Sequence, residues 1–184
     1  MATATETLIT AEEYGRLPDN GQRTELVRGR IVTLNMPYPR HGEICARIAY
    51  LLQRYLEDHD LGRVVANDSG TITERGPDTV RGMDVGYYSF SRVSKGRLPR
   101  RYLDVSPELV FEVRSPSDRW PRINAKVGEY LNAGVIAVCV VDEQTETATV
   151  FRADDPPQVL RADEELAFPD ILPEFRVPVR RFFE

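Results

Sequence analysis

The feature that most constrains this chain is a short apolar run that contains a carboxylate. The run from Leu109 to Val113 is apolar except for Glu112, and Pro107 and Pro116 bound it. An apolar run of this length between prolines predicts a buried strand. Burying a carboxylate costs free energy unless a cation, a hydrogen bond or a metal ion compensates it. The fold must therefore supply a partner for Glu112.

The residues after this run predict a helix and then a second buried strand. Pro121 suits a first helical turn, Ser117 and Asp118 are candidate N-caps, and Gly134 suits the end of the helix. The run 135–141 is almost continuously apolar, as strands covered on both faces are. Strand, helix and buried strand predict a βαβ unit with a right-handed crossover. The expected apolar face of the helix consists of Ile123, Val127, Tyr130 and Leu131.

Two more helices are predicted in the first third of the chain. Thr10 and Glu13 form a capping-box pattern for a short helix that ends near Leu17. Pro37 and Pro39 are expected to break the chain before a longer amphipathic helix. The apolar face of that helix consists of Ile44, Ile48, Leu51, Leu52, Tyr55 and Leu56.

Strand patterns fill most of the remaining sequence. Two of them form a hairpin around Arg28 and Gly29, and another carries Asp84 in an apolar context. A further strand pairs with 135–141 across a turn near Asp142. The predicted strands are 24–27, 31–34, 64–73 with an interruption at Ser69-Gly70, 80–88, 147–152, and short strands near 159, 166–168 and 175–179.

The composition is that of an ordinary globular protein, and we expect one domain over residues 1–184. Cys45 and Cys139 are expected to be free thiols, which favours a reducing, cytoplasmic location. No apolar run approaches the roughly 20 residues of a membrane span, and we see no signal peptide. The net charge is -5, yet residues 92–126 carry nine basic and four acidic side chains. That segment is either a solvated surface or a phosphate-binding one.

Four residues around the central strand need a common explanation. Carboxylates on neighbouring strands, here Asp84 and Glu112, suit the hard cations Mg²⁺ and Mn²⁺. Lys126 borders the apolar face of the following helix, so its amine can reach the end of the strand and act on water or on charge at phosphorus. Arg114 lies two residues after Glu112, on the same side of the strand. The alternative is a buried ion network without a ligand.

Two further residues have an ordinary and a functional interpretation. Glu25 lies in the first strand of the hairpin, where an exposed strand residue is the ordinary interpretation. His41 extends the apolar face of the long helix, where a histidine usually packs or caps.

In their order along the chain, these motifs resemble the Uma-type restriction endonuclease family of the PD-(D/E)XK nuclease superfamily. The resemblance extends from about Leu8 to Phe182. Its most specific part is Glu112-Val113 with Ser115-Pro116-Ser117, followed by Lys126 and Tyr130 and then by Ala133-Gly134-Val135. The other matching elements are Tyr14, the run Glu25 to Gly29, His41, the run Val80 to Val85, and Val141-Asp142.

The resemblance implies an α/β, restriction-endonuclease-like core, in which helices flank a central mixed β-sheet, preceded by an N-terminal helix and a β-hairpin. It implies that Asp84 and Glu112 bind Mg²⁺, with Mn²⁺ as a substitute and the Val113 carbonyl as a third ligand. The superfamily lysine normally lies two residues after the glutamate, where this chain has Arg114, so the resemblance moves that role to Lys126. Met83 replaces the motif proline.

The resemblance implies a metal-dependent endonuclease that hydrolyses phosphodiester bonds in DNA. Glu25 would orient water or a second ion. The residues expected to contact nucleic acid are Arg114, Arg119, Arg122 and His41. A homodimer would suit the cutting of two strands, and no membrane partner is expected. The alternative is a catalytically silent module of the same fold that binds nucleic acid or serves assembly.

Overall fold

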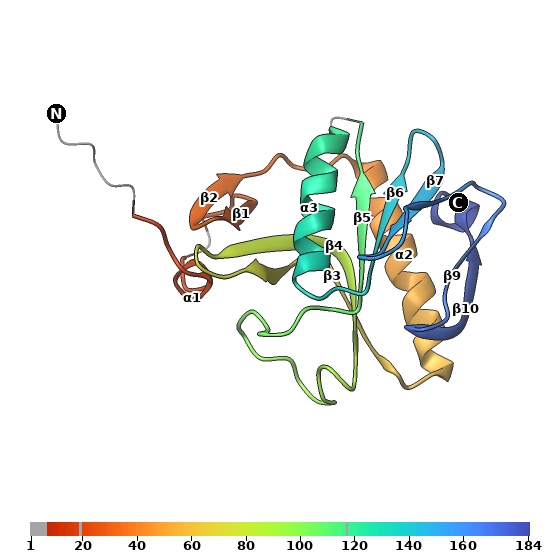
Figure 1. Cartoon of the computed structure of the whole chain (residues 1–184), viewed down its shortest axis with the longest axis horizontal. Helices are drawn as coiled ribbons and strands as arrows, with labels where there is room; N and C mark the ends of the chain where they lie inside the picture. Colours follow the sequence, from red (N-terminus) through yellow and green to blue (C-terminus); the bar gives the residue numbers. More distant parts are fainter. Residues whose placement is uncertain (1–6, 19, 117) are drawn as a thin grey trace.

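A mixed sheet organises the chain, which is described here from a computed structural model covering residues 7–18, 20–116 and 118–184 (Figure 1). Its three α-helices in this part of the chain are α1 (Ala11–Tyr14), α2 (Pro39–Asp58) and α3 (Trp120–Asn132). The strands of the first half are β1 (Thr24–Val27), β2 (Arg30–Thr33), β3 (Gly62–Glu74), β4 (Thr79–Ser89) and β5 (Leu109–Arg114). The later elements are β6 (Ala137–Asp142), β7 (Thr147–Phe151), β8 (Gln158–Leu160), β9 (Glu165–Phe168), β10 (Leu172–Pro178) and the 3₁₀ helix η1 (Val179–Phe182).

The main sheet has eight strands in the order β2-β1-β4-β5-β6-β7-β8, and β3 pairs with β4 outside this path. Strands β5 and β6 are parallel, and α3 connects them as the expected crossover. The other described pairs are antiparallel, including β6 with β7, so the predicted mixed sheet is confirmed. Strands β9 and β10 form a separate two-stranded sheet.

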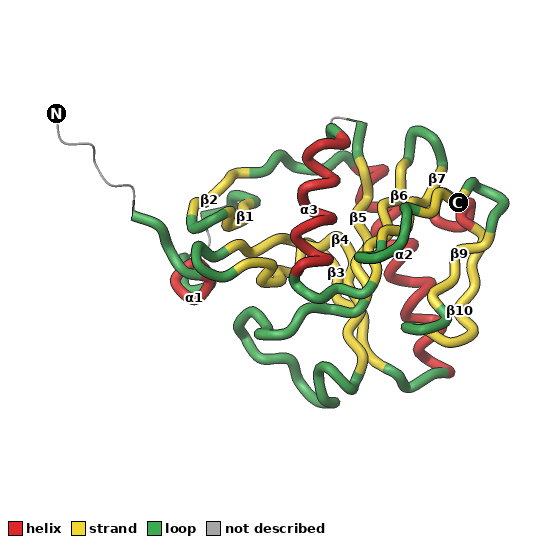
Figure 2. Tube along the Cα trace, viewed as in Figure 1, coloured by secondary structure: helices red, strands yellow, loops and turns green. Residues whose placement is uncertain are grey.

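Helices cover the two faces of the sheet, α2 on one and α3 on the other (Figures 1 and 2). The predicted apolar face of α2 packs with β9, β10 and η1 on the first face, where Phe111 and Val113 also point. Val110 packs against α3 on the second face. Side chains alternate along a strand, so Glu112 faces α3 as Val110 does. This alternation places the carboxylate opposite the crossover helix.

A gap in strand pairing lies along one edge of β4. Strand β3 pairs with β4 along one edge, while the other edge meets β1 at Val80 and β5 at residues 85–87. Residues 81–84 therefore lie between the two partners on that second edge. Opposite Asp84, β3 carries a bulge at Asn67 and Asp68, both with positive φ. The divergence of β1 and β5 from β4 and the bulge of β3 therefore interrupt the regular strand pairing around Asp84.

Several predicted boundaries differ from the structure. Helix α2 begins at Pro39, which was expected to break the chain, because proline is compatible with the first helical position. Helix α1 ends at Tyr14 rather than near Leu17. The predicted cap Asp118 instead accepts hydrogen bonds from the backbone N–H and Oγ of Ser115, and Arg119 is the N-cap of α3.

Other boundaries shift by one or a few residues. Gly134 does follow the end of α3, with a φ of +91°, and Ala133 is the cap. Ser117, the other candidate cap, lies outside the described residues. The expected interruption of β3 at Ser69 and Gly70 is a bulge two residues earlier, and the strand continues. None of the described helices combines the length and the apolar character that a membrane span requires.

Candidate active site

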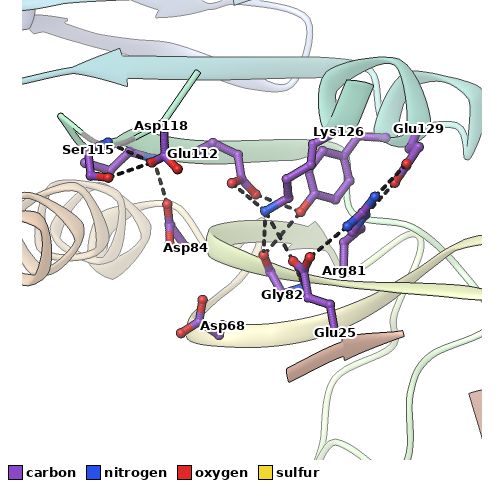
Figure 3. Close-up of polar contacts among 12 residues, drawn as sticks. Glu25, Asp68, Arg81, Gly82, Asp84, Glu112, Ser115, Asp118, Lys126 and Glu129 are labelled. Atoms are coloured by element: carbon purple, nitrogen blue, oxygen red, sulfur yellow. Dashed lines mark hydrogen bonds and ion pairs between the residues drawn. The ribbon is translucent and has the colours of Figure 1, made fainter. Parts of the chain in front are cut away.

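Side chains replace the missing strand partner along the gap in β4. The backbone N–H of Gly82 donates a hydrogen bond to Oε1 of Glu25 at 3.2 Å. The carbonyl of Gly82 accepts from Nζ of Lys126 at 3.2 Å and from the Tyr130 hydroxyl at 3.3 Å. Backbone groups without a strand partner need other partners, and here they bind charged and polar side chains from β1 and α3. The gap thus explains why polar residues converge inside the sheet (Figure 3).

Glu112 has both of the partners that its burial demands. Nζ of Lys126 lies 2.7 Å from Oε2 of Glu112, and the Tyr130 hydroxyl donates to Oε1 at 2.7 Å. Lys126 and Tyr130 are four residues apart on α3 and therefore share one helical face. Burial raises the pKa of Glu112 to about 7, and the neighbouring Asp84 carboxylate adds to the effect, although Lys126 opposes it. The carboxylate therefore gains a proton more easily than an ordinary glutamate does.

Lys126 lies between two carboxylates. Its Nζ is also 3.4 Å from Oε1 of Glu25, which is buried on β1. Burial alone would lower the pKa of Lys126, but the charges of Glu112 and Glu25 outweigh it and raise that pKa. Lys126 and Arg81 likewise lower the pKa of Glu25 against the effect of burial. The exposed-strand interpretation of Glu25 was therefore wrong, since this side chain is 2% exposed and ion-paired.

Asp84 lies where β4 and β5 separate. Its Oδ2 accepts a hydrogen bond from the Val113 N–H at 2.7 Å and lies 3.3 Å from Nε2 of His41. Burial opposes ionisation, but the hydrogen bond from His41 and its charge hold the pKa of Asp84 below its usual value. The N–H and C=O of one strand residue point toward the same edge, so the Val113 carbonyl also points to the β4 side of β5.

His41 connects Asp84 to a thiol on the same helix. Its Nδ1 lies 3.4 Å from Sγ of Cys45, one turn further along α2. Among the described residues, His41, Cys45 and Asp84 are the three whose ligand atoms lie within 4.8 Å of one another. This donor set is softer than the carboxylate pair and suits Zn²⁺ better than Mg²⁺. Burial and the charge of Asp84 raise the pKa of Cys45, so the thiol is protonated near neutral pH.

The charged residues open into one cavity of about 360 Å³. Its wall includes Asp84, Glu112 and Lys126, and Arg122 of α3 lies at its rim. The segment between β2 and α2 also lines it, with Met36 79% and Tyr38 70% exposed. A ligand can therefore reach both carboxylates from solvent.

The predicted arginines have different environments. Arg119 and Arg122 are exposed at the start of α3. Arg114 is largely buried, where it donates to Asp142 at 2.7 Å and to the backbone carbonyl of Asp118, with its guanidinium over the Trp120 ring. It would have to exchange some of these contacts to bind a phosphate.

Four residues to which the sequence analysis gave no role join the site, namely Arg81, Glu129, Arg23 and Asp68. Arg81 binds both Glu25 and Glu129, and Arg23 lies between Asp68 and Asp84. Asp68 lies in the β3 bulge, and the distance from Arg23 to Oδ1 of Asp84 is 4.0 Å. Periodicity could not reveal these partners, because the bulge and the gap in β4 arise from tertiary pairing.

The donor set of Asp84, Glu112 and the Val113 carbonyl fits Mg²⁺ or Mn²⁺. All three donors are oxygens, and Oδ1 of Asp84 and both oxygens of Glu112 keep lone pairs that their present contacts do not use. Lys126 now compensates the charge of Glu112, as a bound cation would. The residues present are therefore compatible with such an ion.

Comparisons with known proteins identify the family and the fold of the chain. A family model described as "Uma2: Putative restriction endonuclease" matches residues 11–180. The chain belongs to the Uma2 family. A search of curated protein sequences finds no significant match.

A solved structure shows that this fold is shared beyond the chain itself. It is a crystal structure of a "putative nuclease belonging to DUF820" from Anabaena variabilis ATCC 29413, and it matches with a TM-score of 0.82. The match covers 95% of this chain and 97% of that one at 19% sequence identity. The predicted α/β, restriction-endonuclease-like architecture of this Uma2 member is therefore confirmed.

Proposed function

We propose that this Uma2 protein is a metal-dependent endonuclease that hydrolyses phosphodiester bonds in DNA. The observation that carries the proposal is the pair of buried carboxylates, Asp84 and Glu112, which face one open cavity beside the ammonium group of Lys126. Lys126 and His41 compensate part of the charge of these two buried acids, and a cation bound in the cavity would compensate more of it. The family match supports a nuclease, and the donor chemistry supports the metal.

Each residue has a proposed role in this reaction. Asp84, Glu112 and the Val113 carbonyl would hold Mg²⁺, for which Mn²⁺ could substitute. A bound ion of this kind would polarise the phosphodiester and favour ionisation of a water molecule. The charges of Glu112 and Glu25 raise the pKa of Lys126, so its amine holds its proton and can position the attacking water. It would stabilise the charge that develops on the phosphoryl oxygens.

The remaining predicted residues act around this centre. Glu25 holds Lys126 and Gly82 in place and can orient water. Arg119 and Arg122 bind the phosphates of DNA on either side of the cut, and Arg114 remains a predicted phosphate contact. His41, which was predicted to contact nucleic acid, is buried and lies 3.3 Å from Asp84, so its proposed role is to orient that carboxylate. A homodimer would place two such centres on two strands.

The first test is a Mn²⁺ titration by calorimetry on the wild-type protein and on the Asp84→Ala, Glu112→Ala double variant. We expect saturable binding by the wild type and none by the double variant. Asp170→Ala is the matched control, because it removes a carboxylate that is ion-paired with Arg152 at another place on the surface. Binding that survives in the double variant would contradict the site assignment.

Plasmid cleavage then separates the nuclease from a silent module of the same fold. We expect Mg²⁺-dependent nicking by the wild type and by Asp170→Ala, and loss of cleavage with retained DNA binding in Asp84→Ala. DNA binding without cleavage in the wild type would favour the silent module. Absence of metal binding, both alone and with a short duplex, would favour a structural ion network.

A further inference from the structure

The ammonium group of Lys126 meets its partners only if the helix that carries it is held in one orientation relative to the strands. A lysine side chain has four rotatable bonds, and its ammonium group binds as a point charge without directional preference. Here the group must remain between Glu112, Glu25 and the Gly82 carbonyl. All three partners lie on strands, whereas Lys126 lies on α3. The rotation of α3 about its axis therefore decides whether the amine meets them.

Arg81 connects α3 to the strands at this level. Its Nε and Nη2 donate to the two carboxylate oxygens of Glu129 at 2.5 and 2.7 Å, which is a bidentate pair. Its Nη1 donates to Oε2 of Glu25 at 2.8 Å. Arg81 is 8% exposed, so water screens these bonds little. Figure 3 shows the guanidinium between Glu129 and Glu25.

The sequence positions make this contact relevant to Lys126. Glu129 follows Lys126 by three residues, so the two lie on adjacent turns of one side of α3. Arg81 directly precedes Gly82, whose carbonyl accepts from Lys126. Glu25 joins the two cations, since one of its oxygens binds Arg81 and the other faces Lys126. The rigid guanidinium of Arg81 therefore fixes the helix that carries Lys126, through Glu129, and the carboxylate of Glu25 that faces Lys126.

We propose that Arg81 is a positioning residue, which fixes α3 and Glu25 so that the ammonium of Lys126 is held against Glu112. The consequence for catalysis rests on the proposed nuclease function, but the positioning itself does not. The competing explanation is that Arg81 merely stabilises the fold, as many buried ion pairs do. If Arg81 positions Lys126, its removal should expose Lys126 to solvent while the core stays folded. If Arg81 only stabilises the fold, Lys126 and the core should become accessible together.

The chain offers a direct readout, because its two lysines are Lys95 and Lys126. Lys95 is 61% exposed and serves as an internal standard for acetylation by an N-hydroxysuccinimide ester, read by peptide mass spectrometry. Cys139 is fully buried in β6, so its alkylation reports global opening. The variants are Arg81→Met and the control Arg152→Met, which removes another bidentate arginine pair, at 2.8 Å from Asp170.

In Arg81→Met we expect acetylation of Lys126 relative to Lys95 to rise about tenfold, while Cys139 remains protected; such a factor corresponds to about 1.4 kcal/mol of local restraint. In Arg152→Met the ratio should equal that of the wild type. Unchanged protection of Lys126 in folded Arg81→Met would overturn the proposal. A parallel rise at Lys126 and Cys139 would also overturn it, because it would show a purely structural role.

A milder variant covers the case in which Arg81→Met does not fold. Glu129→Gln keeps the shape of this half-buried side chain and removes the negative charge that pairs with Arg81. We therefore expect a smaller rise in acetylation of Lys126 than in Arg81→Met. Its absence would again refute the positioning role. In the cleavage assay both variants should lower kcat with little change in KM. A wild type without cleavage but with Arg81-dependent protection of Lys126 would refute the nuclease function alone.

Discussion

Replacing Lys126 by methionine should test how much the buried charges depend on one another. Met retains much of the apolar stem and removes the cation that lies 2.7 Å from Glu112 and 3.4 Å from Glu25. Removing one partner of a buried ion pair typically costs about 3–5 kcal/mol, since the other charge remains buried. For a protein of this size that loss corresponds to a melting temperature lower by roughly 6–20 °C.

The loss should depend on pH in a defined direction. The folded-state pKa of Glu112 is about 7, whereas its ordinary value is 4.5. Between these two pH values the unfolded state binds fewer protons than the folded state, so the free energy of unfolding falls as the pH rises. Without Lys126 the folded-state pKa rises further, and the unfavourable interval extends above pH 7. Glu25 changes in the same sense, because Lys126 helps to lower its pKa. Lys126→Met should therefore be most destabilised at pH 8 and least at pH 5.5.

The assay is urea unfolding of wild type and variant at both pH values. Lys95→Met is the matched control, since Lys95 and its partner Asp60 are both exposed, and we expect a change within about 0.5 kcal/mol. A Lys126→Met variant with equal destabilisation at pH 5.5 and 8, or with a loss below about 1 kcal/mol, would refute the reasoning. It would mean that water already solvates the Glu112 carboxylate or that another cation compensates its charge.

Three further predictions follow from the same geometry. Tyr130→Phe removes a 2.7 Å hydrogen bond to Glu112 and should cost about 1.5–3 kcal/mol in urea unfolding; no loss would show that the bond is unimportant. Affinity for Mn²⁺ should rise about tenfold between pH 6 and 8 in calorimetry, because the ion must displace the proton that Glu112 holds below about pH 7; a flat profile would contradict that pKa. Arg122→Ala should weaken DNA binding and reduce its salt dependence by about one counterion, while an unchanged slope would exclude a phosphate contact.

The sequence predicted the main helices and strands because they carry strong local signals, whereas the restriction-endonuclease-like arrangement was implied by the family resemblance. Leu109 to Val113, the face of α2 and the run that became β6 are apolar with a clear period, and burial of such residues is the main driving force of folding. The βαβ unit followed from their order. Helix ends were less certain, as Pro39 and Asp118 show, because the same residue types start, break or cap a helix in different contexts.

The sequence predicted a site at Asp84, Glu112 and Lys126, and the family resemblance added Glu25. The structure brings these four residues together around one cavity and one backbone gap. For Glu112 the reason is local, since a carboxylate inside an apolar strand demands a partner. Arg81, Glu129, Arg23 and Asp68 carry no such local mark. Their roles depend on the separation of β4 from β5 and on the bulge of β3, which are set by strand pairing between distant segments. Only the tertiary structure decides which charges meet there, because pairing between distant segments leaves no periodic trace in the sequence.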